Sequence, residues 1–203
     1  ADAITVGLVD AAVVVCEGAG TVVVTRQEVL QAIGAHMTGL VKTQPIKEIQ
    51  DGLEEKDCIL LDRIGSVNQV QGFKRAVEAG FRKIAVTVAG ERASDAAVLR
   101  KLGAILCVQP IILAVHTTGI SEVEANLLAK SSDIVWSCAS KAVRDVVGKA
   151  SKLQIGISIP VFALSDEGKR LILNRAQAFS GSLVIHQATL PLAPATKQPK
   201  PLI

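Results

Sequence analysis

Short, almost wholly apolar runs alternate with segments of helical periodicity along most of the chain, and this alternation constrains the fold most strongly. The runs span residues 10–16, 83–89, 111–115, 133–136 and 160–164 and are rich in Val, Ile and Ala. Runs of this kind suit strands that are buried on both faces of a sheet. Helical segments separate most of them, which predicts right-handed βαβ crossovers. We therefore predict an α/β fold with a mostly parallel sheet flanked by helices on both faces, a Rossmann-like three-layer sandwich.

Local signals refine this pattern. Glu17-Gly18-Ala19-Gly20 interrupts two β-type runs, the second being TVVVT at residues 21–25, and Ser121 with Glu124 has the spacing of a capping box. Pro45 is suited to the first position of a short helix. A helix is expected at 29–39, with Val29, Leu30, Ile33 and Met37 on one face and Gly39 as its C-terminal stop. Further helices are expected at 45–52, 67–80, 94–102, 121–130, 142–150 and 166–179. Two further short strands are expected at 58–61 and 183–186.

Domain organisation follows from the same pattern. Residues 1–189 are predicted to form a single α/β domain. The opening nine residues resemble the last turns of a helix, so we expect that a natural N-terminal segment is missing. Residues 190–203 carry Pro191, Pro194, Pro199 and Pro201 and are expected to form an extended tail, either mobile or docked on a neighbour.

Composition excludes several classes of function. Aromatic residues make up 2% of the chain and the net charge is only +3, so a nucleic-acid-binding surface is not expected. The four cysteines form no C-x-x-C pair, which argues against a disulfide framework and a zinc ribbon. No signal peptide or run of about 20 apolar residues is present, so a cytoplasmic protein with no membrane association is expected.

Polar and small residues gather directly after the predicted strands. In an open parallel sheet the ligand crevice lies outside the carboxyl ends of the strands. The loops in question are residues 16–21, 62–63, 89–91, 116–119, 137–140 and 165–166. We predict that they share one face and bind a small anionic ligand or cofactor of unknown identity.

The first of these loops contains Glu17, Gly18, Gly20 and Thr21. A phosphate-binding glycine loop must open a helix, whose N-terminal amides hold the phosphate, whereas here a β-type run follows. A tight turn between two strands is therefore the main interpretation. Glu17 at its tip would then be free to meet a ligand.

Two further loops, residues 116–119 and 137–140, carry side chains suited to ligand binding or catalysis. His116, Thr117, Thr118 and Gly119 join a strand to a capped helix, where free amides and hydroxyls can bind an anion or orient a general base. The alternative is that His116 merely stabilises the turn.

Cys138 precedes Ser140 and Lys141 at the start of the next helix, a position that favours a thiolate. Alternatively, Ser140 is simply the N-cap and Cys138 is packed. If chemistry occurs, His116 is the candidate acid or base and Cys138 the nucleophile. Convergence of Cys16, Cys138 and His116 around a soft metal stays open, although no metal site is predicted from the spacing.

Several sequence blocks together resemble the methanogenesis marker protein eight family. They are DAAVVVCEGAGTVVVT, IAVTVA, AVHTTGIS, CASKAVRDV and GISIPVFALSDEGK, in this order between about Val9 and Arg175. The resemblance implies an archaeal cytosolic protein associated with methane metabolism, and it supplies no catalytic residues. It leaves open a non-catalytic assembly or maturation factor that binds a protein of methane metabolism, a thiol or metal site protein, and a homo-oligomer. Whether the chain is an enzyme is not decided by its sequence.

Overall fold

The chain divides into two compact units, each with its own strands. The computed structural model describes residues 1–35, 42–192, 194 and 196. The first unit comprises Ala1–Val88 and Val98–Ile111, and the second comprises Ala89–Ala97 and Ile112–Ile203. The expected helix stop at Gly39, together with Met37, lies outside the described residues.

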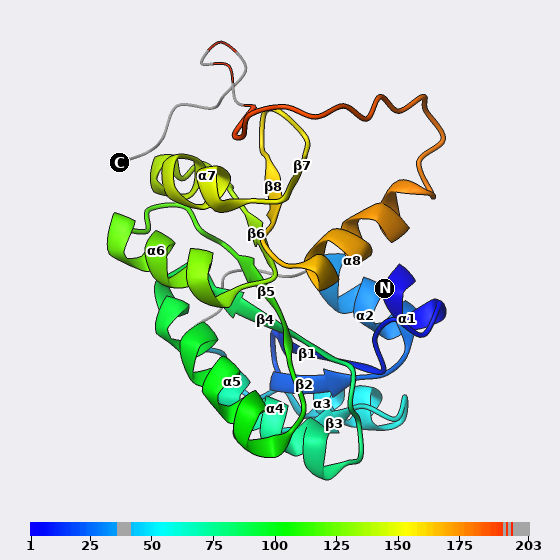
Figure 1. The fold of residues 1–203 in the computed structure, drawn as a ribbon. Helices are drawn as coiled ribbons and strands as arrows, with labels where there is room; N and C mark the ends of the chain where they lie inside the picture. The colour runs from blue at the N-terminus through cyan, green and yellow to red at the C-terminus, as the bar shows by residue number, and fades with distance from the viewer. Residues whose placement is uncertain (36–41, 193, 195, 197–203) are drawn as a thin grey trace. The chain divides into compact units, whose positions relative to one another are not determined.

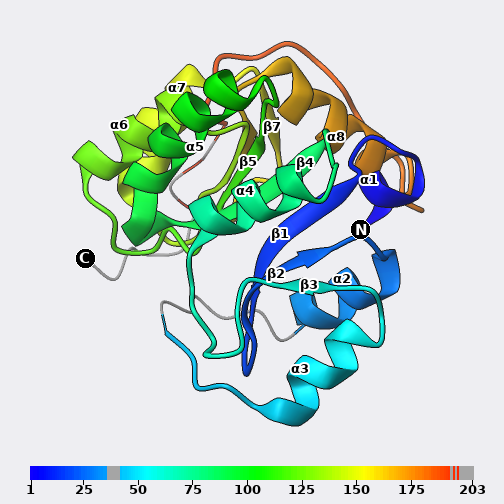
Figure 2. The ribbon, with the colours of Figure 1, turned by 90° about the horizontal axis from the view of Figure 1, so that it is seen from below.

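In the first unit the strands lie in the order β3-β2-β1-β4. Strands β1 (Ala11–Cys16) and β4 (Ile84–Ala89) are parallel, whereas β2 (Gly20–Val24) pairs antiparallel with both β1 and β3 (Ile59–Leu60). The helices are α1 (Asp2–Thr5), α2 (Gln27–Ala35), α3 (Lys47–Glu54) and α4 (Gln69–Glu78). Figure 2 shows α4 on one side of β1 and β2, and α2 and α3 on the other.

In the second unit the strands lie in the order β5-β6-β8-β7. Strands β5 (Ile111–Val115) and β6 (Ile134–Trp136) are parallel, whereas β8 (Val161–Ala163) is antiparallel to both β6 and β7 (Leu153–Ile155). The short helix η1 (Gly90–Arg92) leads into α5 (Ala93–Leu106), whose second half belongs to the first unit. The other helices are α6 (Glu122–Ser131), a segment at 141–150 that contains the π-helical η2 (Val143–Val147) and α7 (Gly148–Ala150), and α8 (Asp166–Ala176).

Helices flank both faces of the second unit's strands. Figure 1 shows α6 and α7 on one side of β5, β6 and β8, with α8 on the other. The core beneath α8 contains Ile134, Ala163 and Ile172. Phe162 on β8 is fully buried on the opposite face, near Gly148 of α7. Aliphatic side chains dominate the core, as expected from a sequence with few aromatic residues.

The α/β class is confirmed, but the sheet is mixed and only partly parallel. No separate sequence signal marks β7, a three-residue strand that lies directly after the helical segment 141–150. Because β7 is antiparallel to β8 and β8 is antiparallel to β6, the crossover from β6 leads to β7, and β8 returns between them. The expected run of parallel strands is therefore broken at this hairpin.

This reversal corrects the expected position of one loop. Residues 165–166 follow β8 and so lie at the opposite end of these strands from the loops after β5 and β6. In agreement, the Ser165 hydroxyl donates a hydrogen bond to Asp133, which immediately precedes β6. Ser165 is the N-cap of α8, where its Oγ accepts from Gly168 N at 3.0 Å.

Several boundaries also differ from those expected. Helix α3 begins at Lys47 with Ile46 as its N-cap, so Pro45 precedes the helix and does not open it. Helix α5 continues to Leu106, and residues 183–186 form no strand. The described part of the tail is docked on its own unit, because the amide of Gln154 bonds to both Leu192 N and Leu192 O. Within the described residues, every helix is too short or too polar to cross a bilayer.

Candidate functional site

The loops that follow β5 and β6 meet at one end of the second unit. Parallel pairing of these strands brings both carboxyl ends to the same edge. The Thr117 hydroxyl donates to Trp136 O at 2.7 Å, and Ala139 N donates to Thr118 Oγ1 at 3.4 Å. Thr117 is fully buried, so its hydroxyl joins the two loops and is not exposed to solvent.

A third expected loop, residues 89–91, lies against the same place. Gly90 is buried, and a Cβ added to it would come within 2.9 Å of Thr117 Cα and 2.8 Å of Ile120 Cγ2. Only a residue without a side chain permits this approach. The structure thus brings the loops after β4, β5 and β6 together, as the sequence pattern predicted.

His116 and Cys138, the two residues expected to carry chemistry, have unusual backbones. His116 has φ +52° and Cys138 has φ +45°, both in the left-handed region that disfavours residues with a side chain. Such conformations tend to occur at functional sites, where the surrounding structure holds them. The Nε2 atom of His116 is buried and has no hydrogen-bond partner among the described residues. Cys138 is half-buried.

The left-handed backbone of His116 predicts how substitutions at this position change the stability of the protein. We expect His116→Gly to be more stable than His116→Ala by about 1 kcal/mol, because glycine adopts a left-handed conformation without the cost of about 1–2 kcal/mol that other residues incur. Urea unfolding followed by the fluorescence of Trp136, which lies in the same unit, measures the difference. At the exposed helical position Ser94 the order should reverse, with alanine more stable than glycine. Equal stabilities of the two His116 variants would contradict the left-handed backbone.

Each of the two loops leads into a capped helix. Ser121 caps α6 with a complete capping box, in which Ser121 Oγ accepts from Glu124 N at 3.3 Å and Ser121 N donates to Glu124 Oε2 at 2.7 Å. Ser140 caps the next helical segment, its Oγ accepting from Val143 N at 3.2 Å. Ser140 is therefore the N-cap, which confirms the structural alternative for this residue.

A pocket of about 410 Å³ lies between these two helix N-termini. It is lined by residues 119–122, 124, 139–142 and 145. The first residues of both helices line it, so backbone N–H groups that have no intrahelical partner border the cavity. Of the predicted site residues, Gly119, Ser140 and Lys141 line this pocket, and His116, Thr117, Thr118 and Cys138 lie in the adjoining loops.

The charges in this pocket are mixed. Lys141 Nζ lies 2.6 Å from Asp145 Oδ2, and the hydrogen bond to Asp145 raises the pKa of Lys141. Glu124 is occupied by the capping box, and Glu122 adds a further negative charge that acts on Lys141. The cavity is thus bordered by helix amides and one lysine as well as by carboxylates.

The remaining predicted residues belong to the first unit, in the hairpin between β1 and β2. Cys16 pairs with Gly20, so residues 17–19 form the tight turn that the sequence predicted. Glu17 is exposed at its tip, and Gly18 N donates to Thr43 Oγ1 at 2.9 Å. Thr21 is fully buried, and its hydroxyl donates to Gln69 Oε1 at 2.9 Å. This hydroxyl is therefore occupied within the protein.

Metal coordination finds no support in the described parts of the chain. No group of three or more His, Cys, Asp or Glu side chains there has an arrangement that could hold a metal ion. Burial raises the pKa of the Cys16 thiol, and it raises that of Cys58 to about 11. Both thiols are therefore kept protonated near neutral pH, which disfavours metal binding by either.

Two acidic residues that line the pocket, Glu122 and Asp145, are not among the predicted site residues. Glu122 follows the Ser121 cap directly, and Asp145 lies four residues after Lys141. The i,i+4 spacing of Lys141 and Asp145 on one helix face is the signal that pairs them. Glu122 had no comparable signal, because acidic residues are common in the first turn of any helix.

Comparison with known proteins places the chain among archaeal relatives. A family model described as an uncharacterised protein conserved in archaea (DUF2099) matches residues 1–177. The uncharacterised protein MJ0054 of Methanocaldococcus jannaschii is 36% identical over 196 residues, which cover 96% of this chain and 67% of that protein. No solved structure matches. The chain belongs to the DUF2099 family of archaeal proteins.

Proposed function

We propose that the second unit binds a small ligand with a carboxylate, phosphate or sulfonate group in the pocket between the N-termini of α6 and segment 141–150. The supporting observation is that the first turns of two helices line one cavity of about 410 Å³. Helix N-termini attract anions through their unpaired N–H groups and the helix dipole. A cavity of this volume is typical of small-molecule sites.

The acidic side chains in the pocket restrict which ligands can bind there. Glu122 and Asp145 would repel a bare anion, whereas a ligand that also carries an amino or hydroxyl group would donate hydrogen bonds to them. Lys141 is paired with Asp145 and also borders the cavity, so it can bind the anionic group of the ligand while it offsets the charge of Asp145. We therefore propose a ligand with both an anionic group and a hydrogen-bond donor. His116 and Cys138 do not line the pocket; if chemistry occurs beside it, these residues of the adjoining loops are the candidate acid or base and the candidate nucleophile.

Titration with three probes tests this proposal. Inorganic phosphate, methanesulfonate and taurine, which adds an amino group to a sulfonate, are titrated against the ¹⁵N-labelled chain. We expect shifts of the Glu122, Lys141 and Ala142 amide resonances, with taurine binding more tightly than methanesulfonate. Lys141→Ala should weaken binding roughly tenfold, whereas Lys149→Ala, an exposed lysine outside the pocket, should leave it unchanged. Equal effects of the two lysine variants, or no shifts at these amides, would refute the proposal.

We further propose that the protein acts in methane metabolism in the archaeal cytoplasm. The support is the resemblance of the blocks AVHTTGIS and CEGAGTVVVT to the methanogenesis marker protein eight family. Membership in an archaeal family and the match to a Methanocaldococcus protein are consistent with it. The AVHTTGIS block includes the loop after β5, so the proposed association and the proposed ligand site involve the same residues.

A further inference from the structure

Exposed large hydrophobic side chains are concentrated in one stretch of the second unit. Among the described residues, fifteen such side chains are exposed, and eight of them lie between Ile157 and Leu192. We call these eight the apolar patch: Ile157, Ile159, Leu173, Phe179, Leu183, Val184, Ile185 and Leu192. Val184 is 87% exposed and Ile185 is 80% exposed. Such a concentration of exposed apolar surface marks an interaction site.

Six of the eight patch residues, all but Ile159 and Phe179, lie beside the edge strand β7. Strand β7 is last in the strand order, and β8 is its partner in the described sheet. Beside it lies a pocket of about 310 Å³, lined almost wholly by aliphatic side chains of β7, α8 and residues 183–192. An edge strand with apolar neighbours is a template for pairing with another extended chain.

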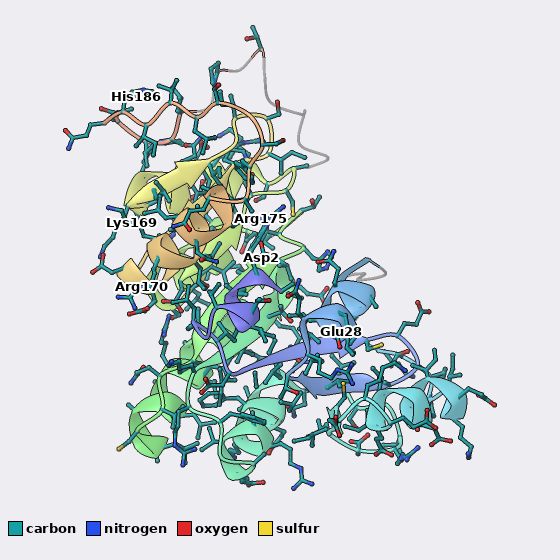
Figure 3. All side chains as sticks on the ribbon, turned by 90° about the vertical axis from the view of Figure 1, so that its right-hand side faces the viewer. Asp2, Glu28, Lys169, Arg170, Arg175 and His186 are labelled. Carbon is teal, nitrogen blue, oxygen red and sulfur yellow. The ribbon has the colours of Figure 1, made fainter. Side chains whose placement is uncertain are left out.

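Residues 182–186 have the character of such an extended chain. The sequence Ser-Leu-Val-Ile-His is rich in β-branched residues, yet it forms no strand in the structure. The two hydrogen bonds between Gln154 and Leu192 hold the chain that follows this segment against β7. Figure 3 labels His186 in the segment, and Lys169, Arg170 and Arg175 on α8, the helix that precedes it.

We infer that the apolar patch is the interface of a two-fold symmetric dimer of this chain. Segment 182–186 of one copy pairs with β7 of the other, and the symmetry operation forms the same contact a second time. Both halves of the contact are present on one surface, as an isologous interface requires. The exposed parts of the eight side chains amount to roughly 800 Å², about what one partner contributes to a standard-size interface.

The oligomeric state in solution tests this inference. Light scattering coupled to size-exclusion chromatography, from micromolar to millimolar concentration, is expected to give twice the chain mass. Val184→Asp and Ile185→Asp should each weaken dimerisation at least about a hundredfold. Ile64→Asp is the matched control, because Ile64 is 76% exposed but lies in the first unit, outside the patch. A monomeric wild-type chain, or a dimer that persists in both patch variants, would overturn the inference.

Amide hydrogen exchange provides a second readout that does not depend on the variants. On raising the concentration of the wild-type chain, the amides of residues 153–155 and 183–186 should become protected together. Protection of neither segment when the mass doubles would overturn strand pairing as the dimer contact. Unchanged circular dichroism of the aspartate variants shows that a lost dimer does not reflect an unfolded monomer.

Discussion

Gly20→Ala is expected to lower the free energy of unfolding of the first unit by about 3–4 kcal/mol. Gly20 has φ +78°, which costs an alanine about 1–2 kcal/mol. A Cβ there would also lie 2.5 Å from both Gly65 C and Ser66 O, which are backbone atoms and cannot rotate away. Overpacking of this kind typically costs about 1–3 kcal/mol. The hairpin must therefore move away from the loop that it contacts.

The affected loop also holds the end of β2. Thr21 N donates to Ser66 O at 2.8 Å, so a displaced loop weakens this hydrogen bond as well. Urea unfolding monitored by far-ultraviolet circular dichroism measures the loss. Gly34→Ala is the control, because a Cβ there has open space within helix α2, and it should be neutral or stabilising by up to about 1 kcal/mol. A Gly20→Ala variant as stable as Gly34→Ala would show that the close approach is wrong.

Asp133→Ala is expected to destabilise the second unit by about 3–5 kcal/mol. Asp133 is buried, its Oδ2 accepts from Ile112 N at 2.6 Å, and its Oδ1 accepts from the Ser165 hydroxyl. This one carboxyl group thereby connects β5, the start of β6 and the N-cap of α8. Removing it leaves a buried N–H and a hydroxyl without these acceptors, and an unsatisfied buried group costs about 1–3 kcal/mol each.

Trp136 is the only tryptophan of the chain and lies three residues after Asp133, so its fluorescence reports on the second unit. Ser165→Ala removes one of the two contacts and also the N-cap hydrogen bond of α8, so it should cost about 1–3 kcal/mol, less than Asp133→Ala. Asp133→Asn keeps the shape but replaces one acceptor oxygen with a donor, and it should fall between the two. A fluorescence midpoint for Asp133→Ala that coincides with that of the wild type would contradict this network.

How far the sequence predicts the fold is illustrated by β5 and β7. Residues 111–115 form a strand at the predicted positions, because Pro110 and a run of branched apolar residues set its start and length. Strand β7 has three half-buried residues, one of them Gln154, so it has neither the length nor the alternation that identifies a strand. The hairpin with β8 therefore has no sequence signal, and the pattern predicts a mostly parallel sheet where the structure has a mixed one.

The candidate site was predictable to a similar degree. The gathering of the loops after β4, β5 and β6 followed from polar residues at strand ends. The left-handed backbones of His116 and Cys138 did not, because this conformation is normally signalled by glycine or asparagine. The pocket itself depends on how two helix starts are spaced in three dimensions, which no sequence pattern records.

The π-helical turn at Val143–Val147 has a consequence for how this site can change in evolution. Such a turn is equivalent to one extra residue accommodated within an α-helix. Losing that residue would leave a regular helix whose first turn, with Lys141 and Ala142, is rotated by about 100° relative to its last. A single codon deletion is thus a route by which relatives could redirect these groups and acquire a different ligand preference, with the strands underneath left intact.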